Sequence, residues 1–544
     1  MKQPFYPKFF SLLKLGITRK QAMSDLFAGI VVGIVALPMS IAFAIASGLS
    51  PEKGIITAIV AGFIVSLLGG SRVQIAGPTG AFVVIIFGIL QKYGYEGLVI
   101  STILAGIFLI IFGLLKLGDL LKYLPHPLIV GFTSGIALVI ASTQVKDALG
   151  LPITNIPAEF LGKWSVYLAN IAKINPYAII ITIATILILT YTKNSKSKIP
   201  GSLIAIFLFT IIVKVFQIPV TTIETFYGEI HAEFSFTLPH IHWSSIVLYL
   251  KPALAIALLG GIESLLSAVV SDGMIGANHR SNTELIAQGI ANIFSPLFGG
   301  IPATGALARA AANVKNGGRT PIAGMVHSAI LLLSLVFFGG LAKLIPMSCL
   351  SGILIVVAYN MSEWRSFLSI LRGSFFDVII LVSTFILTVF VDLIIAIEVG
   401  VVLSSLLFMK RMADFGTQNI DVVDQDLIDD YSNLPEQINV YEISGPLFFG
   451  SAKAYTQVIK QFGNKSKVLI IRMRHVPFVD STGVNNLKDV LKILKNSGVE
   501  IILSGVNKSV LNEFEKNNIF MFLNQNNIFN TFSKAIDKAK KIIE

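Results

Sequence analysis

Two stretches of the chain repeat a short pattern that could bind an anion. Gly77-Pro78-Thr79-Gly80-Ala81 lies in the first half, and Pro302-Ala303-Thr304-Gly305-Ala306 lies in the second. Proline and glycine interrupt backbone hydrogen bonding, so we expect helices to begin near Thr79 and Thr304, either of which could cap its helix or donate to a ligand. The N–H groups at a helix start carry a partial positive charge and attract anions. Kinks held by neighbouring helices are the alternative interpretation.

Ionisable side chains occur close to this repeat. Glu263 lies in the middle of an otherwise apolar run, Gly260 to Ser267, and Arg309 follows Thr304 by five residues. Ionisable groups inside a membrane are costly and usually functional. Glu263 could carry a proton or bind a cation beside the anion, with Ser267 one turn further along. Alternatively, Glu263 pairs with Arg309 or with the backbone.

The composition indicates a membrane protein. The 544 residues are 54% hydrophobic and 13% charged, whereas soluble domains carry about 25% charged residues, and the mean hydropathy is +0.77. Several apolar runs reach the roughly 20 residues that span a bilayer. These runs cover residues 26–46, 54–69, 97–115, 128–142, 177–191, 201–216, 246–271, 327–346, 376–391 and 393–409.

The positive charge follows the ends of these runs. A net charge of +11 could suggest nucleic acid, but basic residues that gather beside spans are typical of cytoplasmic loops. Segment 217–245 carries acids and no Lys or Arg, which places it outside; its histidines His231, His240 and His242 lack a metal-ligand pattern. We therefore expect a multi-pass protein of the inner (plasma) membrane, with both termini cytoplasmic and an even number of spans. The start shows no removable signal peptide, and a single cysteine excludes an intramolecular disulfide.

A second repeat supports two homologous halves. Lys122-Tyr-Leu-Pro125 is followed by Gly131, and Lys343-Leu-Ile-Pro346 by Gly352, a shift of 343 − 122 = 221 residues. The Thr-Gly-Ala shift is 304 − 79 = 225 residues. We expect repeats at about 24–215 and 217–412 with seven spans each, the third and tenth short. An odd number per half inverts the second copy, as in many secondary transporters. The extended entries into the broken helices are predicted at Val73–Ala76 and Leu297–Ile301.

The C-terminal part has a different composition. We predict a cytoplasmic N-terminal segment at 1–23, a membrane domain at 24–412, an acidic linker at 413–436 and a cytoplasmic α/β domain at 437–544. In this last domain, strands are predicted at 438–443, 468–473 and 499–504. Helices are predicted at 451–462, 483–496 and 508–517.

The chain resembles the sulfate permease (SulP/SLC26) family of anion transporters over nearly its whole length. The C-terminal domain resembles STAS, the module of anti-sigma-factor antagonists, with Asp480-Ser481-Thr482-Gly483 where that module opens a helix. The matching membrane stretches are Val35-Ala36-Leu37-Pro38, Gln74-Ile75-Ala76-Gly77-Pro78-Thr79-Gly80-Ala81, Gly261-Ile262-Glu263-Ser264-Leu265-Leu266 and Gly299-Gly300-Ile301-Pro302-Ala303-Thr304-Gly305-Ala306.

The resemblance implies a fourteen-span fold with a core (spans one to four and eight to eleven), a gate, an elevator-like movement of the core, and homodimers to which STAS contributes contacts. The anion would sit between the third and tenth helix starts, and Glu263 matches the position linked to proton or sodium coupling. The implied anion-binding positions are Thr79, Gly80, Ala81, Gly305, Ala306, Leu307, Ala308 and Arg309.

Two departures from the family pattern affect the expected site. In many relatives a polar residue directly follows this proline. Here Met39 follows Pro38 and Ser40 comes next, so the sequence does not support the family's polar contact from the first span. Leu307 and Ala308 are apolar, so the anion would rely on backbone N–H groups. In STAS, Ser481 or Thr482 could accept a phosphate, or Ser481 could simply cap the helix.

Three hypotheses follow for function. The first is secondary active transport of sulfate, bicarbonate or a C4-dicarboxylate, coupled to H⁺ or Na⁺ through Glu263. The second is an uncoupled anion channel of the same fold. The third is a membrane receptor that signals through STAS to a cytoplasmic protein. The sequence contains no nucleophile–base arrangement or phosphate-binding loop, so we do not expect an enzyme, and we expect no metal or other cofactor and no nucleic-acid partner.

Overall fold

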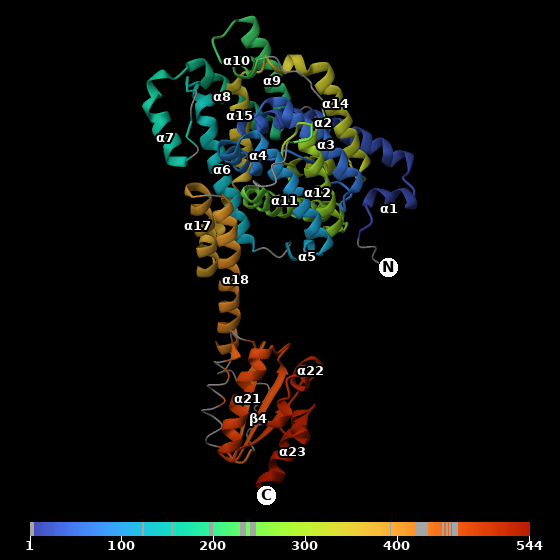
Figure 1. Cartoon of the computed structure of the whole chain (residues 1–544), viewed down its shortest axis with the longest axis vertical. Coiled ribbons are helices and arrows are strands. Elements are labelled where there is room, and N and C mark those ends of the chain that lie inside the picture. Colours follow the sequence, from blue (N-terminus) through green and yellow to red (C-terminus); the bar gives the residue numbers. More distant parts are fainter. Residues whose placement is uncertain are drawn as a thin grey trace. The chain divides into compact units, whose positions relative to one another are not determined.

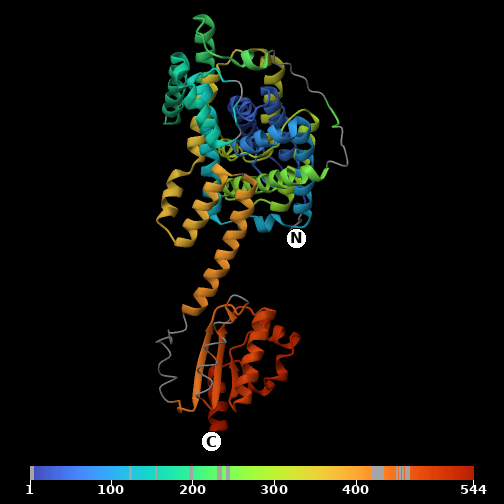
Figure 2. The same cartoon turned by 60° about the vertical axis from the view of Figure 1, so that its left-hand side comes forward.

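The computed structural model describes residues 5–121, 125–153, 156–157, 159–194, 200–228, 236–239, 246–391, 393–418, 434–448, 451–452, 455, 459 and 466–544. The chain divides into two compact units, Met1–Val401 and Val402–Glu544 (Figures 1 and 2). Several features discussed above lie outside the described residues, namely His231, His240, His242, Lys122 and most of the predicted linker and of the predicted helix 451–462.

The first unit is helical apart from two short strands. Its elements are α1 (Lys8–Leu15), α2 (Arg19–Ala46), α3 (Pro51–Leu68), β1 (Ala76–Gly77), α4 (Gly80–Leu114), α5 (Gly118–Leu121), α6 (His126–Leu149), α7 (Phe160–Ala169), η1 (Ile171–Lys173), α8 (Pro176–Asn194), α9 (Gly201–Val215), α10 (Ile223–Tyr227), α11 (Ile246–Ile275), α12 (Ser281–Leu297), β2 (Thr304–Gly305), α13 (Leu307–Lys315), α14 (Ile322–Ala342), α15 (Met347–Met361), α16 (Trp364–Leu371), α17 (Phe375–Phe390) and α18 (Leu393–Gln418), which crosses into the second unit.

Among the described residues, five helices are long and apolar enough to cross a membrane: α2, α3, α4, α6 and α11. Shorter apolar stretches lie in α8, α9, α14 and α17. Helix α4 is two helices joined at Gly94, whose φ of 69° suits glycine. A helix satisfies its backbone polar groups internally, so such segments tolerate lipid. The count of fourteen spans stays a prediction.

Contacts between the two sequence halves are reciprocal. Helix α4 packs on α12 while α3 packs on α14, and α6 packs on α17 while α15 packs on α8. The second sequence repeat explains part of this. Pro125 and Pro346 are the N-cap residues of α6 and α15, and Gly131 and Gly352 let α17 and α8 approach closely. This is the pattern expected of two related halves.

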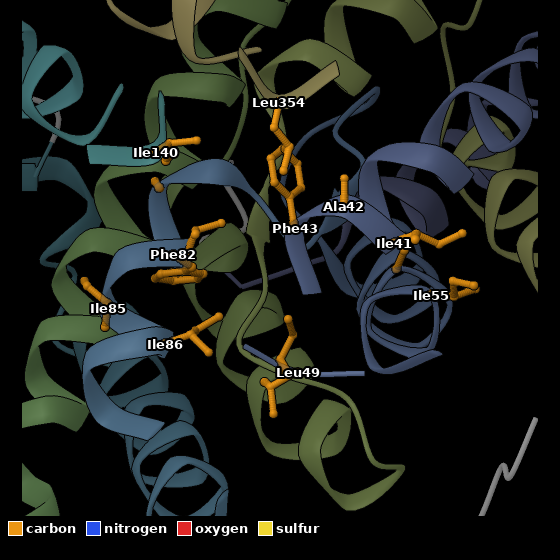
Figure 3. Close-up of a cluster of buried hydrophobic side chains, with 14 of the residues drawn as sticks. Ile41, Ala42, Phe43, Leu49, Ile55, Phe82, Ile85, Ile86, Ile140 and Leu354 are labelled. Atoms are coloured by element: carbon orange, nitrogen blue, oxygen red, sulfur yellow. The ribbon is translucent and has the colours of Figure 1, made fainter. Parts of the chain in front are cut away.

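The hydrophobic core of the first unit joins both halves. Phe43 and Ile41 of α2, Phe82 and Ile86 of α4, and Leu354 of α15 belong to one buried cluster (Figure 3). In Figure 1, α2, α3, α11, α12 and α14 gather on one side of this unit, and α6, α7, α8 and α17 on the other. Small residues at the helix contacts, such as Gly106 and Gly289 of α4 and α12, bring backbones close together.

The second unit contains a parallel sheet in the order β3-β4-β5-β6. Its elements are β3 (Ile438–Ser444), β4 (Val468–His475), α21 (Ser481–Asn496), β5 (Glu500–Ser504), α22 (Lys508–Lys516), η4 (Ile519–Met521), η5 (Gln525–Asn527), β6 (Ile528–Phe529) and α23 (Phe532–Ile543). Alternate residues of β4 face opposite cores. Leu469 and Ile471 pack in the cluster with α21 and α22, and Val468 and Ile470 pack with α23. The predicted strands match within two residues, and β6 and α23 were not predicted.

Candidate anion-binding site

The two broken segments of the repeat meet inside the first unit. Strand β1 pairs antiparallel with β2, with Ala76 opposite Gly305 and Gly77 opposite Thr304. The N–H of Ala306 donates to the carbonyl of Ile75 over 2.9 Å. This short pairing satisfies backbone N–H and C=O groups that are not part of a helix. Membrane proteins tolerate such non-helical backbone only inside the protein or along a cavity. The two helix starts that follow, those of α4 and α13, are therefore held beside each other.

The starts differ in detail from the prediction. Helix α4 begins at Gly80 with Thr79 as its N-cap residue, as expected, although the Thr79 side chain makes no capping hydrogen bond. Helix α13 begins at Leu307 rather than near Thr304, because Thr304 and Gly305 continue the strand that pairs with β1. The predicted extended segment Leu297–Ile301 is also misplaced, since α12 continues to Leu297. The first-turn N–H groups at the second start thus belong to Leu307, Ala308 and Arg309.

Glu263 reaches the first helix start. The Thr79 hydroxyl donates to Glu263 Oε2 over 3.1 Å, and Glu263 is partly buried on α11. Ser267, four residues further along, shares that face of the helix. Its hydroxyl oxygen is buried and has no hydrogen-bond partner among the described residues. The structure therefore brings one predicted coupling residue next to one predicted anion-binding residue.

Arg309 is 2% exposed and belongs to the second helix start. Its Nη2 donates to Ser40 Oγ over 3.1 Å and to the Pro78 carbonyl over 3.2 Å. Its Nη1 is buried and has no hydrogen-bond partner within the described part of the chain. The alternative in which Glu263 pairs with Arg309 is wrong for this structure, because the two side chains bond to different groups. A cation in the first turn of a helix lies at the positive end of the helix dipole. The charge of Arg309 and the dipole of α13 therefore add to each other at this site.

The predicted contact residues fall into two groups by exposure. Gly80, Ala81, Gly305 and Ala306 are buried, whereas Leu307 is 46% exposed and Ala308 is also exposed. An added Cβ at Gly80 would lie 2.7 Å from Met361 Sδ, and one at Gly305 would lie 1.9 Å from Gln74 Nε2. These two glycines are needed for close packing. The open side of the site is formed by Thr79 and the first turn of α13.

Several polar residues that position the site were not predicted. Ser264 Oγ accepts from the Gly305 N–H over 3.0 Å and lies 2.9 Å from Thr304 Oγ1. Gln74 Nε2 donates to the Ser264 carbonyl, and Asn292 bonds both backbone groups of Ala303. The first span does provide a polar contact, because Ser40 of α2 accepts a hydrogen bond from Arg309. Polar side chains within apolar runs are the sequence signal that could identify these residues, because buried polar groups are usually hydrogen-bonded.

In the second unit, Ser481 and Thr482 are exposed at the start of α21. Asp480, not Ser481, caps this helix, and its Oδ1 accepts from the Gly483 N–H over 2.7 Å. The carboxylate is favoured at this position because it also complements the positive helix end. The predicted capping by Ser481 is therefore wrong, and both hydroxyls face solvent.

A helical membrane unit interrupted at two paired helix starts, followed by an α/β unit, defines this chain as a membrane transporter with a STAS-type domain. The sequence profile of the sulfate permease family matches residues 23–384, and the STAS domain profile matches residues 432–535. The chain belongs to the sulfate permease family.

Individual relatives agree with this assignment. The chain is 39% identical over 517 residues to "Putative sulfate transporter YvdB" of Bacillus subtilis, covering 94% of this chain and 97% of that protein. It is 30% identical to the bicarbonate transporter BicA of Picosynechococcus, over 91% of each chain. The structure of the BicA transmembrane domain matches with a TM-score of 0.64 at 31% identity, covering 70% of this chain and 98% of that one. The SLC26A9 structure shares the fold, with a TM-score of 0.87 at 20% identity over 98% of this chain and 92% of that one.

Proposed function

We propose that this chain is a secondary active transporter of small anions, coupled to H⁺ or Na⁺ through Glu263. One observation carries the proposal: the β1–β2 pairing places two helix starts together, with the buried guanidinium of Arg309 between them. Backbone N–H groups and one cation select for charge and size, which suits sulfate, bicarbonate and C4-dicarboxylates such as fumarate. The names of YvdB and BicA support the first two anions.

Coupling follows from the position of Glu263 beside the first helix start. An ionised carboxylate and a bound anion repel each other at short range. A proton or Na⁺ on Glu263 and Ser267 removes this repulsion, so anion and cation bind together. The Thr79 hydroxyl links the two sites because it donates to Glu263, and Thr79 is the residue directly before the first turn of α4.

Movement is proposed to be of the elevator type. Helices α2, α3, α4, α11, α12 and α14 pack mainly with one another, as do α6, α8, α15 and α17. The helix starts belong to the first group, the core, and Gly80 touches Met361 and Ile140 of the second group, the gate. The protein would act as a homodimer in the inner membrane, with both termini cytoplasmic and STAS available to a cytoplasmic partner.

Uptake into proteoliposomes tests the proposal. We expect labelled sulfate, bicarbonate or fumarate to accumulate under an imposed proton or sodium gradient. Glu263→Gln should abolish gradient-driven accumulation while exchange of anion for anion persists. The matched control is Glu96→Gln, because Glu96 is exposed on α4. Anion flux without accumulation under either gradient would favour a channel, and absence of flux with intact anion binding would favour a receptor. Full accumulation by Glu263→Gln would refute the coupling role.

A further inference from the structure

A cavity of about 310 Å³ lies in the first unit, and its lining includes none of the residues of the helix-start site. It is bounded by α4, α6, α7, α17, the end of α2 and the first turns of α11. Its charged lining residues, among those the structure describes, are Lys92, Lys163, Lys251 and Glu159. Three ammonium groups against one carboxylate leave the lining with a surplus of positive charge.

Lys163 is the unusual member of this set. It is 2% exposed, and its ammonium lies 5.3 Å from the centre of the Phe87 ring. Within the described ranges, this ammonium makes no ion pair or hydrogen bond. Burial of a charge without a charged partner is costly unless another group compensates it, and a cation–π contact supplies only part of that compensation. A buried ammonium that lines a cavity is suited to an anion.

The rim of the cavity carries the remaining charges. Lys92, Lys251 and Glu159 are all exposed. Lys92 also lies 5.3 Å from the centre of the Tyr93 ring. Exposed lysines raise the local concentration of anions, because charges of one sign at a concave opening focus the field. The rim would therefore attract an anion that Lys163 then binds.

Helix α4 connects this cavity to the helix-start site. Val83, three residues after the helix begins, lines the cavity, and so does Tyr93. At a rise of about 1.5 Å per residue, the cavity follows α4 from roughly 5 Å to roughly 20 Å beyond the helix start. The cavity thus lies along one continuous helix that leads to the site.

We propose that this cavity is a second anion-binding site, in which Lys163 binds a small oxyanion on its way to or from the helix starts. The proposal rests on the proposed function for the direction of travel only, because binding at Lys163 is measurable without transport. With both termini cytoplasmic, α4 runs outward from Gly80, so the cavity opens to the outside.

Binding is tested by fluorescence of Trp164, the residue next to Lys163. The full chain with Trp243→Phe and Trp364→Phe leaves Trp164 as the single reporter. We expect saturable quenching by iodide that sulfate displaces. Lys163→Gln should weaken iodide quenching about fivefold to tenfold, the effect of removing one positive charge within about 6 Å at intermediate dielectric. Quenching by neutral acrylamide should stay unchanged, and Lys163→Arg should retain the iodide effect.

The matched control is Lys173→Gln, because Lys173 is exposed on η1 and does not line the cavity. It should leave iodide quenching unchanged. A second variant fills the cavity directly. Gly88 lines the cavity and an added Cβ there has no heavy atom within 4 Å, so Gly88→Leu should extend a side chain into the space. It should abolish the saturable component of quenching while the protein stays folded.

Transport then tests the role of the site. Lys163→Gln should raise the KM for external anion about fivefold, with the maximal rate within about twofold of the parent. The KM measured from the cytoplasmic side should not change. Iodide quenching identical in Lys163→Gln and the parent would overturn the proposal. If Lys163-dependent quenching occurs but the parent transports no anion, the second site stands and the proposed function fails.

Discussion

Gly77→Ala is the smallest change that should disturb the helix-start site, because Gly77 lies against the guanidinium of Arg309. A Cβ at residue 77 would lie 2.0 Å from Arg309 Nη1, whereas ordinary contact begins at 3.4 Å. The guanidinium must therefore move by about 3.4 − 2.0 = 1.4 Å. Gly77 is not among the residues with positive φ, so the strain comes from contact alone.

A shift of this size exceeds the tolerance of the hydrogen bonds that hold Arg309. Its bonds to Ser40 and to the Pro78 carbonyl are 3.1 and 3.2 Å long, and N–H···O bonds weaken beyond about 3.2 Å. Hydrogen bonds to charged groups contribute about 1.5–3 kcal/mol each. Loss of one, with partial relaxation of the other, gives a destabilisation of about 2–4 kcal/mol and a guanidinium displaced from the anion.

We expect Gly77→Ala to reduce the initial rate of anion uptake at limiting concentration by at least about tenfold, measured in proteoliposomes beside thermal unfolding of the purified protein. Gly273→Ala is the control, because a Cβ there has no heavy atom within 4 Å. Adding Arg309→Lys to Gly77→Ala should restore stability in part, since lysine lacks the group that clashes. Wild-type uptake by Gly77→Ala would refute the argument that the position of Arg309 matters.

Three further predictions concern residues that position the site or its partner domain. Ser264→Ala removes the acceptor for the Gly305 N–H and should lower the free energy of unfolding by about 1–3 kcal/mol, measured by thermal denaturation; no change would mean that β2 is held by its pairing alone. Thr79→Val keeps the shape of the side chain but loses the donor to Glu263, so coupled uptake should fall about tenfold. Thr79→Ser should retain most of the uptake. Equal uptake rates for the two variants would show that the hydroxyl has no role in coupling. Asp480→Ala should increase hydrogen exchange in the first turn of α21 in the full-length protein, consistent with loss of a cap that contributes about 1 kcal/mol; unchanged exchange would show that Asp480 does not stabilise the helix start.

Local features of the site were predictable from the sequence because they depend on neighbouring residues. Proline and glycine next to Thr79 indicated the start of α4 within one residue. Pro125 and Pro346 marked the starts of α6 and α15, as proline does at the beginning of a helix. The alternation of apolar and charged residues after Met412 likewise predicted the strands of the second unit. Each of these signals acts over a few residues.

The rest of the site depends on contacts between distant segments. Arg309 bonds to Ser40 and Pro78, which precede it by 269 and 231 residues. Nothing near Arg309 in the sequence shows whether it bonds to Ser40 and Pro78 or pairs with Glu263. The start of α13 was misplaced for the same reason, because Thr304 and Gly305 belong to a strand only when β1 is beside them. Pairing of this kind is set by the fold as a whole and has no local signature.

Under the proposed function, the arrangement of charges also gives the Glu263 carboxylate a role. Arg309 and the start of α13 both contribute positive charge, and Glu263 of α11 bonds to Thr79 instead of to Arg309. Among the described residues, no carboxylate therefore pairs with Arg309, which favours an anion there. Glu263 opposes that anion unless it holds a cation, because both would be negative in a region of low dielectric. In the proposed mechanism, anion and cation would then bind only as a pair, and a core that carries both would be close to neutral when it moves past the gate.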